Sequence, residues 1–346
     1  MRKIFAKQEH CVLKNDGYNG GMNQEKNPLL RRIVAGLLLG LVVIVALMLA
    51  SDLRQVLALM RVFRWEWLPL VLCATLFNYT LRFIKFHYYL GLSGVKNLPW
   101  PHSLRLFVAG FPLAVTPGKV GEVLKAVWVK DACGLPVAKG TAVVVAERLS
   151  DGLAVLGLAS LGVAIWPQYW PAFTLLLAGL LGVVIVSQIR PLALWFLRLG
   201  EKLPLVRRFV HNLREFYEGS FVLLQPKAIL MAVGLGMVSW LGEGIGFYLI
   251  LMGLGQPAST ALLISAVFIL SFSTLVGAVS ALPGGLGAAE ISIAGMLVVL
   301  AGLSPSCASA ATLLIRLATL WFGVLLGLGA WAFWPKMVGL KAERVE

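Results

Sequence analysis

The sequence predicts an all-α, polytopic membrane protein with about six full transmembrane helices and two re-entrant hairpins, arranged as an inverted repeat. Of the 346 residues, 59% are hydrophobic and only 13% are charged, against about 25% charged residues in soluble domains. Apolar runs recur at lengths that cross a bilayer. Two of these runs are broken at their centres by Pro-Gly. A soluble domain is therefore excluded, and four cysteines without a C-x-x-C spacing exclude a disulfide scaffold.

The chain begins with a polar, Gly- and Asn-containing tail, residues 1–31, which we expect to be disordered and cytoplasmic. The first apolar run, Ile33–Ala50, is long enough to span. The long tail before it and the lack of a cleavage site argue against a signal peptide. The other full spans are expected over residues 66–90, 141–165, 171–189, 227–253 and 308–334. Residues 32–335 then form one membrane domain, followed by a cytoplasmic tail over 336–346.

Two further apolar stretches, residues 103–131 and 258–302, contain Pro-Gly at their centres. Each half is short for a complete span. We interpret both stretches as re-entrant hairpins that enter and leave the membrane on one side. The alternative is that every half crosses obliquely, which gives ten spans.

The basic residues indicate the orientation. Segment 190–226 and both tails are rich in Lys and Arg, and six spans with two hairpins place all three on one side, the cytoplasm. The loops expected on the other side carry no charge, except for residues 51–65, which contain Arg54, Arg61 and Arg64. The Lys and Arg residues that give the net charge of +14 lie mainly in loops between the apolar runs, as membrane topology requires. We therefore expect no nucleic-acid partner.

Within the cytoplasmic segment 190–226, residues 205–221 alternate apolar and charged side chains at helical spacing. This pattern predicts an interfacial amphipathic helix on the cytoplasmic leaflet. The alternative is a connecting helix that packs on the bundle.

A weak internal repeat relates the two broken stretches. One copy reads Thr116-Pro-Gly-Lys-Val-Gly-Glu122 and is followed by Arg148, and the other reads Leu282-Pro-Gly-Gly-Leu-Gly-Ala-Ala-Glu290 and is followed by Arg316. In each copy the order is span, broken hairpin, span. The two copies cover about residues 66–165 and 227–334. Three crossings separate the 66–90 span from the 227–253 span, so the two copies should face opposite ways, as in inverted-repeat transporters.

Ionisable residues at membrane depth need a partner or a function, because an isolated charge there costs about 3 kcal/mol or more. Acids and bases among them are nearly balanced, as expected of paired groups around a polar cavity. They are Arg82, Lys85, Lys119, Glu122, Lys125, Glu147, Arg148, Asp151, Glu243, Glu290 and Arg316.

Each Pro-Gly turn begins a half-helix whose first N–H groups point toward the break. Glycines keep the backbone accessible there, and Lys119 adds a positive charge, so the site suits an anion such as a phosphate. Glu122 and Glu290 are interpreted as helix caps, partners of Arg148 and Arg316, or proton carriers. The candidate substrate-binding residues are Pro117, Gly118, Lys119, Gly121, Glu122, Arg148, Asp151, Glu243, Pro283, Gly284, Gly285, Gly287, Glu290 and Arg316.

Plainer interpretations stay open for some of these features. A Pro-Gly pair can be a simple helix kink. The cluster of Glu147, Arg148 and Asp151 can be structural. Arg82 and Lys85, with His87, can snorkel to headgroups near the end of their span. Arg316 lies about eight residues inside its span, so a buried partner is expected.

An enzyme is the competing class. The four histidines, His10, His87, His102 and His211, lie outside any H-x-x-x-x-D arrangement, and the sequence contains no metal-ligand cluster and no Walker-type loop. We therefore expect no catalytic residues, no cofactor and no metal ion.

These motifs, together with Glu147-Arg148-x-x-Asp151, resemble the flippase-like membrane region of lysylphosphatidylglycerol synthases over about residues 32–335. The resemblance implies lipid translocation by a stand-alone module, without the aminoacyl-transferase domain of the bifunctional proteins. It implies a phosphate-bearing lipid, such as an aminoacyl-phospholipid or a polyprenyl-phosphate-linked lipid, as substrate in the bacterial inner membrane.

Two alternatives to lipid translocation stay open. One is an ion-coupled secondary transporter of a soluble anion, and the other is a non-catalytic membrane partner of a lipid-synthesis enzyme. A homo-oligomer also stays open. Because the sequence contains no ATP site, we expect passive or ion-coupled transport.

Overall fold

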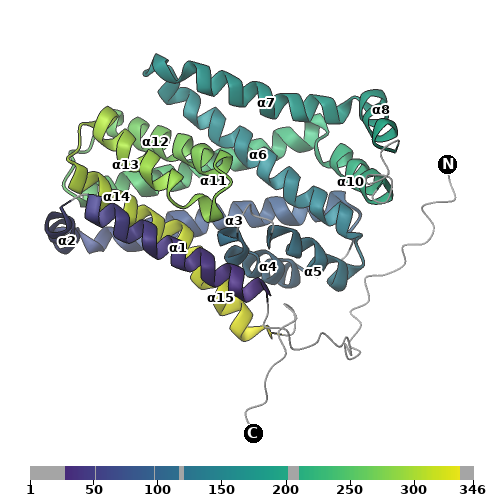
Figure 1. Cartoon of the computed structure of the whole chain (residues 1–346), viewed down its shortest axis with the longest axis horizontal. Helices are drawn as coiled ribbons and strands as arrows, with labels where there is room; N and C mark the ends of the chain where they lie inside the picture. Colours follow the sequence, from purple (N-terminus) through teal and green to yellow (C-terminus); the bar gives the residue numbers. More distant parts are fainter. Residues whose placement is uncertain (1–27, 51, 97, 117–120, 202–209, 336–346) are drawn as a thin grey trace, which may run out of the picture.

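The described residues of the computed structural model, 28–50, 52–96, 98–116, 121–201 and 210–335, form helices and short connections without a strand (Figure 1). The predicted all-α class is thereby confirmed. α1 (Pro28–Ala50) begins four residues before the predicted domain boundary. The rest of the predicted N-terminal tail, the first Pro-Gly turn and the C-terminal tail lie outside the described residues.

The six predicted full spans correspond to long helices. They are α1, α3 (Leu68–Leu92), α6 (Val137–Val163), α7 (Trp170–Gln188), α11 (Pro226–Gly253), and the continuous run of α14 (Pro305–Arg316), the π-helix η6 (Leu317–Trp321) and α15 (Phe322–Phe333). By length and apolar composition, six described helices can cross a membrane: Trp65–Leu92, Pro167–Gln188, Pro226–Gly253, Thr260–Val279, Pro283–Ala301 and Pro305–Phe333. Four of these coincide with predicted spans. α6 is long enough, but four charged side chains lower its apolar character.

The first broken stretch is a hairpin of short helices, α4 (Trp100–Ala109) with η2 (Phe111–Val115) and α5 (Leu124–Cys133). Each ten-residue helix is about 15 Å long. The second is α12 (Thr260–Val279), η5 (Pro283–Gly285) and α13 (Ala288–Ala301). With 20 residues, about 30 Å, α12 can cross a bilayer by itself, so the prediction that each half of this stretch is short was wrong. Its apolar helix starts right after the Ser259 cap and runs unbroken to Val279.

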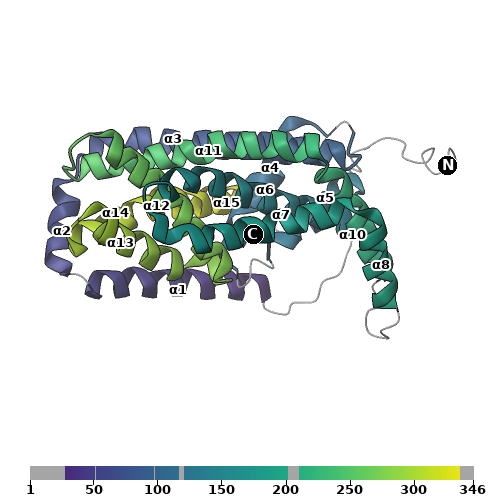
Figure 2. The same ribbon diagram turned by 90° about the horizontal axis from the view of Figure 1, so that it is seen from above.

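The two hairpins approach from opposite ends of the bundle and meet inside it (Figures 1 and 2). α12, α13 and α14 share one end with α2 (Leu53–Val62), whereas α4 and α5 lie toward the end that carries α8 (Arg190–Glu201) and α10 (Val210–Leu223). η2 contacts η5. Because α3 runs away from α2 and α11 runs toward it, the two span–hairpin–span units are antiparallel, as an inverted repeat requires.

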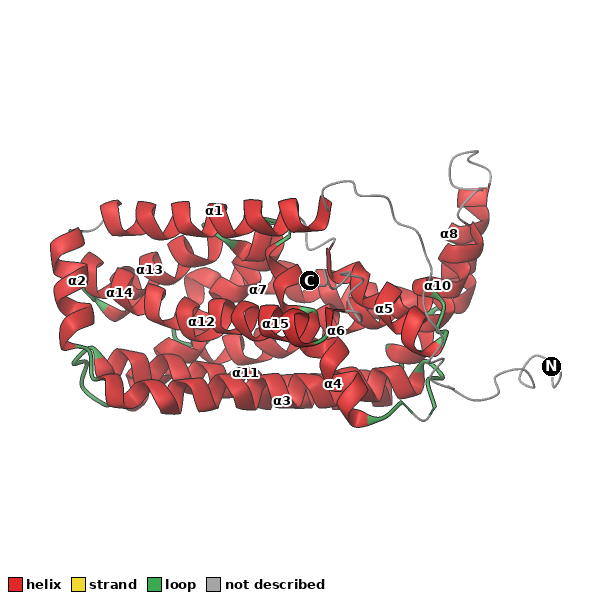
Figure 3. Ribbon diagram, turned by 90° about the horizontal axis from the view of Figure 1, so that it is seen from below, coloured by secondary structure: helices red, strands yellow, loops and turns green. Residues whose placement is uncertain are grey.

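The connecting segment ends in a helix that packs on the bundle. α10 contacts α3, α6, α7, α8 and α11, and Gly219 lies against Ala142 of α6. Residues 210–223 thus follow the alternative in which a connecting helix packs on the bundle, and residues 202–209 lie outside the described residues. Figure 3 shows α8 projecting from the same end.

Candidate functional site

Most of the charged residues of α3, α6 and α11 lie between two apolar cores. One core contains Val71 of α3 and Phe247 of α11 and gathers at the α2 end. The other contains Phe86 of α3 and Ala232 of α11 and gathers around α4 and α5. Arg82, Lys85 and Glu243 fall between these apolar positions in the sequence. Glu147, Arg148 and Asp151 of α6 likewise fall between Ala146 of one core and Val155 of the other, so this charged layer lies in the interior of the molecule.

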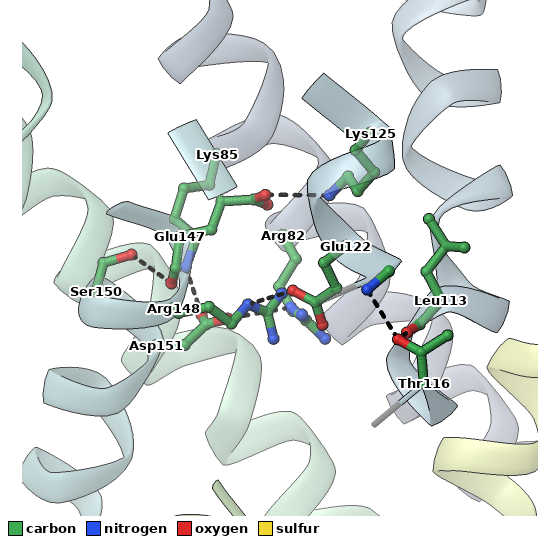
Figure 4. A network of polar contacts seen from close by, with 11 residues as sticks. Arg82, Lys85, Leu113, Thr116, Glu122, Lys125, Glu147, Arg148, Ser150 and Asp151 are labelled. Atoms are coloured by element: carbon green, nitrogen blue, oxygen red, sulfur yellow. Dashed lines mark hydrogen bonds and ion pairs between the residues drawn. The ribbon is translucent and has the colours of Figure 1, made fainter. Parts of the chain in front are cut away.

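Ion pairs tie α6 to α3 and α5 in the first repeat (Figure 4). Lys85 Nζ pairs with Asp151 Oδ1, and Arg82 Nε lies 3.5 Å from Asp151 Oδ2. Lys125 Nζ donates to Glu147 Oε2 at 3.1 Å. The Lys85 side chain is only 1% exposed, so it does not snorkel, and Arg82 points inward with it. Asp151 and Glu147 therefore act at least as structural partners of buried cations.

The remaining acid–base pair of the first repeat joins the first hairpin to α6. Arg148 Nε lies 3.3 Å from Glu122 Oε2, and the Arg148 side chain is 35% exposed. Just before Glu122, the N–H of Gly121 donates to Thr116 Oγ1 at 3.0 Å, which closes the chain across the turn. Pro117, Gly118 and Lys119 lie in that turn, outside the described residues. This arrangement holds Glu122 at the beginning of the second hairpin arm, as predicted.

The second repeat contains the matching pair. Arg316 Nε donates to Glu290 Oε1 at 2.5 Å, and Arg316 Nη2 donates to the carbonyl oxygen of Gly284 at 2.9 Å. Glu290 Oε2 also accepts from the N–H of Gly287 at 2.7 Å. Gly284 and Gly287 have φ of 61° and 89°, which favours glycine at both positions. Arg316 thus has the buried partner that its depth predicted, and it holds the hairpin turn as well.

The two arginine–glutamate pairs occupy equivalent places in the two repeats. Glu122 precedes Arg148 by 26 residues, since 148 minus 122 is 26, and Glu290 precedes Arg316 by the same 26. In both cases the Glu lies at the beginning of the second hairpin arm and the Arg on the helix that follows. η2, which precedes the first turn, also meets the second turn, because a Cβ on Gly284 would lie 3.5 Å from Val115 Cγ1. The site is therefore built from both halves of the chain.

A cavity of about 180 Å³ lies between the hairpins and α3, α6, α11 and α14. Its described lining carries four cations, Arg82, Lys125, Arg148 and Arg316, but two carboxylates, Glu122 and Glu243. The other acids of the cluster, Glu147, Asp151 and Glu290, pair with these cations or with Lys85 without lining the cavity. Cations and carboxylates are equal in number among the described residues of the whole charged layer, whereas the residues that line the cavity include more cations than carboxylates. That face suits an anion.

The predicted site residues divide accordingly. Gly284 and Gly285 line the cavity with Glu122, Arg148, Glu243 and Arg316. Gly121, Asp151, Pro283, Gly287 and Glu290 support it from neighbouring positions.

Sequence reasoning missed several lining residues. Lys125, Tyr79 and Trp240 all line the cavity, and the Arg82 guanidinium lies 5.6 Å from the centre of the Trp240 ring. Helical spacing could have indicated two of them, because residues three apart lie on the same face of a helix. Tyr79 precedes Arg82 by three residues, and Trp240 precedes Glu243 by three. The π-helix after Arg316 had no such signal. Tyr79 Oη donates to the carbonyl oxygen of Thr319 within it at 2.6 Å, and π-bulges frequently mark functional sites.

Comparison with known proteins gives a family and two relatives. A sequence profile described as the lysylphosphatidylglycerol synthase TM region matches residues 33–327. Two relatives are described as UPF0104 membrane proteins of Methanothermobacter thermautotrophicus (strain Delta H). One is 36% identical over 141 residues, which is 40% of this chain and 40% of that relative. The other is 26% identical over 270 residues, which is 69% of this chain and 79% of that relative. This chain therefore covers less than half the length of the first relative.

Proposed function

Because the chain belongs to the family of the lysylphosphatidylglycerol synthase transmembrane region, we propose that it moves a phosphate-bearing lipid between the leaflets of a bacterial inner membrane. Aminoacyl-phospholipids and polyprenyl-phosphate-linked lipids are examples of this substrate class, and both termini are cytoplasmic. The observation that carries the proposal is the cavity between the two hairpins, whose lining has more cations than carboxylates.

Arg148 and Arg316 are the residues proposed to receive the phosphate. Each lines the cavity and pairs with a Glu. An arriving phosphate competes with these Glu side chains, and a guanidinium can hold it through two parallel hydrogen bonds. One Arg comes from each repeat, so a phosphate bound between them joins the two halves of the molecule.

The size of the cavity fits a headgroup phosphate better than a whole lipid. Its 180 Å³ is about six times the roughly 30 Å³ share of one liquid water, whereas pockets for drug-sized ligands measure about 300–1,000 Å³. In the proposed mechanism the phosphate enters the charged layer while the acyl chains stay in the bilayer. This avoids the cost of moving an unpaired charge through hydrocarbon.

The test is translocation by the purified protein in proteoliposomes. A fluorescent short-chain phosphatidylglycerol analogue is placed in one leaflet, and the fraction that albumin can extract from the outer leaflet is followed over time. We expect exchange well above that of protein-free liposomes. Exchange at the protein-free rate, combined with uptake of inorganic phosphate into the same vesicles, would favour the soluble-anion transporter instead.

A further inference from the structure

Glu243 differs from the other carboxylates of the charged layer. Glu122, Glu147, Asp151 and Glu290 each pair with a cation at 3.5 Å or less. No described cation lies within 4 Å of Glu243, although it is only 5% exposed and lines the cavity. It lies among the residues of the proposed phosphate site without a partner of its own.

The charges around Glu243 come from both repeats. α11 packs against α3, α6, α12 and α14, and against α10 and η1 (Trp65–Trp67). Arg82 of the first repeat and Arg316 of the second line the same cavity as Glu243, as does Tyr79, and Asp151 lies beside Arg82. α12 contains no titratable side chain, and the residue before η1, Arg64, donates its N–H to the carbonyl oxygen of Gly253, the last residue of α11. Arg82 and Arg316, which share the cavity with Glu243, are therefore already engaged by Asp151 and Glu290.

An anion in the cavity changes this balance. A phosphate held by Arg148 and Arg316 cancels part of the positive field at Glu243 and adds a negative charge beside it. A buried carboxylate that loses its stabilising cations takes up a proton. By linkage, if phosphate binding favours the protonated carboxyl, then protonation strengthens phosphate binding by the same factor.

From this placement we infer that Glu243 is the proton carrier of a lipid–proton symport, in which one proton crosses with each lipid phosphate. The inference rests on the proposed function. The proton comes from the aqueous phase on the side where the lipid loads, binds the Glu243 carboxylate as the phosphate displaces the Glu partners of the arginines, and leaves on the other side when the lipid is released. A phosphodiester with charge −1 and one proton together carry no net charge.

The experiment uses the albumin-extraction assay with a pH gradient of one unit, with the vesicle interior alkaline. Coupling of one proton per lipid predicts a final inner-to-outer ratio of the phosphatidylglycerol analogue near 10, because one pH unit is a tenfold ratio. Glu243→Gln, compared at an equal amount of inserted protein, should lose this accumulation and reach a ratio no higher than about 1. The matched control is Glu218→Gln on α10, whose carboxylate is half exposed and pairs with Arg190 outside the cavity, and it should reach the wild-type ratio.

Two results separate this inference from the proposed function. If the wild-type protein exchanges the lipid but reaches an inner-to-outer ratio of 1 under the gradient, the symport is wrong and the proposed translocation is unaffected. If it exchanges no lipid at all, the proposed translocation itself is wrong. A ratio near 10 in Glu243→Gln removes Glu243 as the carrier.

A second measurement applies if Glu243→Gln does not insert into the membrane. Short-chain phosphatidylglycerol is added to weakly buffered wild-type protein in detergent, and a pH indicator reports proton uptake. We expect uptake that approaches one proton per bound lipid, and binding without uptake contradicts the inference.

Discussion

Replacing Arg316 tests whether the hairpin arginines hold the phosphate. Arg316 makes two contacts, to Glu290 Oε1 and to the carbonyl oxygen of Gly284, through different nitrogens of one guanidinium. Lys keeps the charge but offers a single ammonium, so Arg316→Lys loses the two-nitrogen geometry. A hydrogen bond to a charged group is worth about 1.5–3 kcal/mol, and about 1.4 kcal/mol is tenfold. We therefore expect translocation to fall about 10- to 150-fold in Arg316→Lys.

Arg316→Ala should remove nearly all translocation. It leaves Glu290 with the Gly287 N–H but without its cation, and breaking a buried ion pair costs about 3–5 kcal/mol of stability. Rates are therefore compared at equal amounts of inserted protein, with thermal unfolding in detergent as the fold control. Arg190→Ala is the matched control, because the Arg190–Glu218 pair is exposed and such pairs contribute about 0–1 kcal/mol. Wild-type rates in both Arg316→Ala and Arg148→Ala would show that these arginines are structural and that the site lies elsewhere.

The other predictions concern packing, buried charge and topology. Gly327→Ala should lower stability by about 1–3 kcal/mol, because its Cβ would meet Pro112 Cδ at 2.2 Å, whereas Gly329→Ala on the same helix has nothing within 4 Å and should unfold at or slightly above the wild-type temperature. Asp151→Asn leaves buried Lys85 without its carboxylate partner and should cost about 3–5 kcal/mol, measured as a lower unfolding temperature. A single cysteine in α10, in a background without the native cysteines, should resist an impermeant maleimide added from the periplasmic side, and robust labelling there would reverse the proposed orientation.

Much of the fold was predictable because membrane helices leave strong sequence signals. Long apolar runs located α3, α7, α11 and the α14–α15 run to within a few residues. The length of α12 was not predictable in the same way, because an apolar run with a Pro-Gly break fits both a hairpin arm and a full span.

The site was partly predictable because buried charges need partners. The depth of Arg316 required a buried acid, and the repeat pointed to Glu290 and, by equivalence, to Glu122 with Arg148. The partners of Lys85 and Lys125 depend on how α3 and α5 rotate against α6, which spacing along one helix does not determine. Tyr79 and Trp240 line the cavity because α3 packs against α11. That contact joins residues far apart in the chain. The π-helix after Arg316 depends on the packing of the surrounding helices rather than on its own residues.

The position of a bound lipid phosphate distinguishes a transport site at the two arginines from binding at the membrane surface. The measurement is an experimental structure of the protein in nanodiscs that contain phosphatidylglycerol. We expect phosphate density within hydrogen-bond distance of both Arg148 and Arg316, displacement of Glu122 or Glu290 from its arginine, and acyl-chain density that continues into the bilayer. Lipid phosphates found only at the membrane surface, with both arginine–glutamate pairs intact, would contradict it.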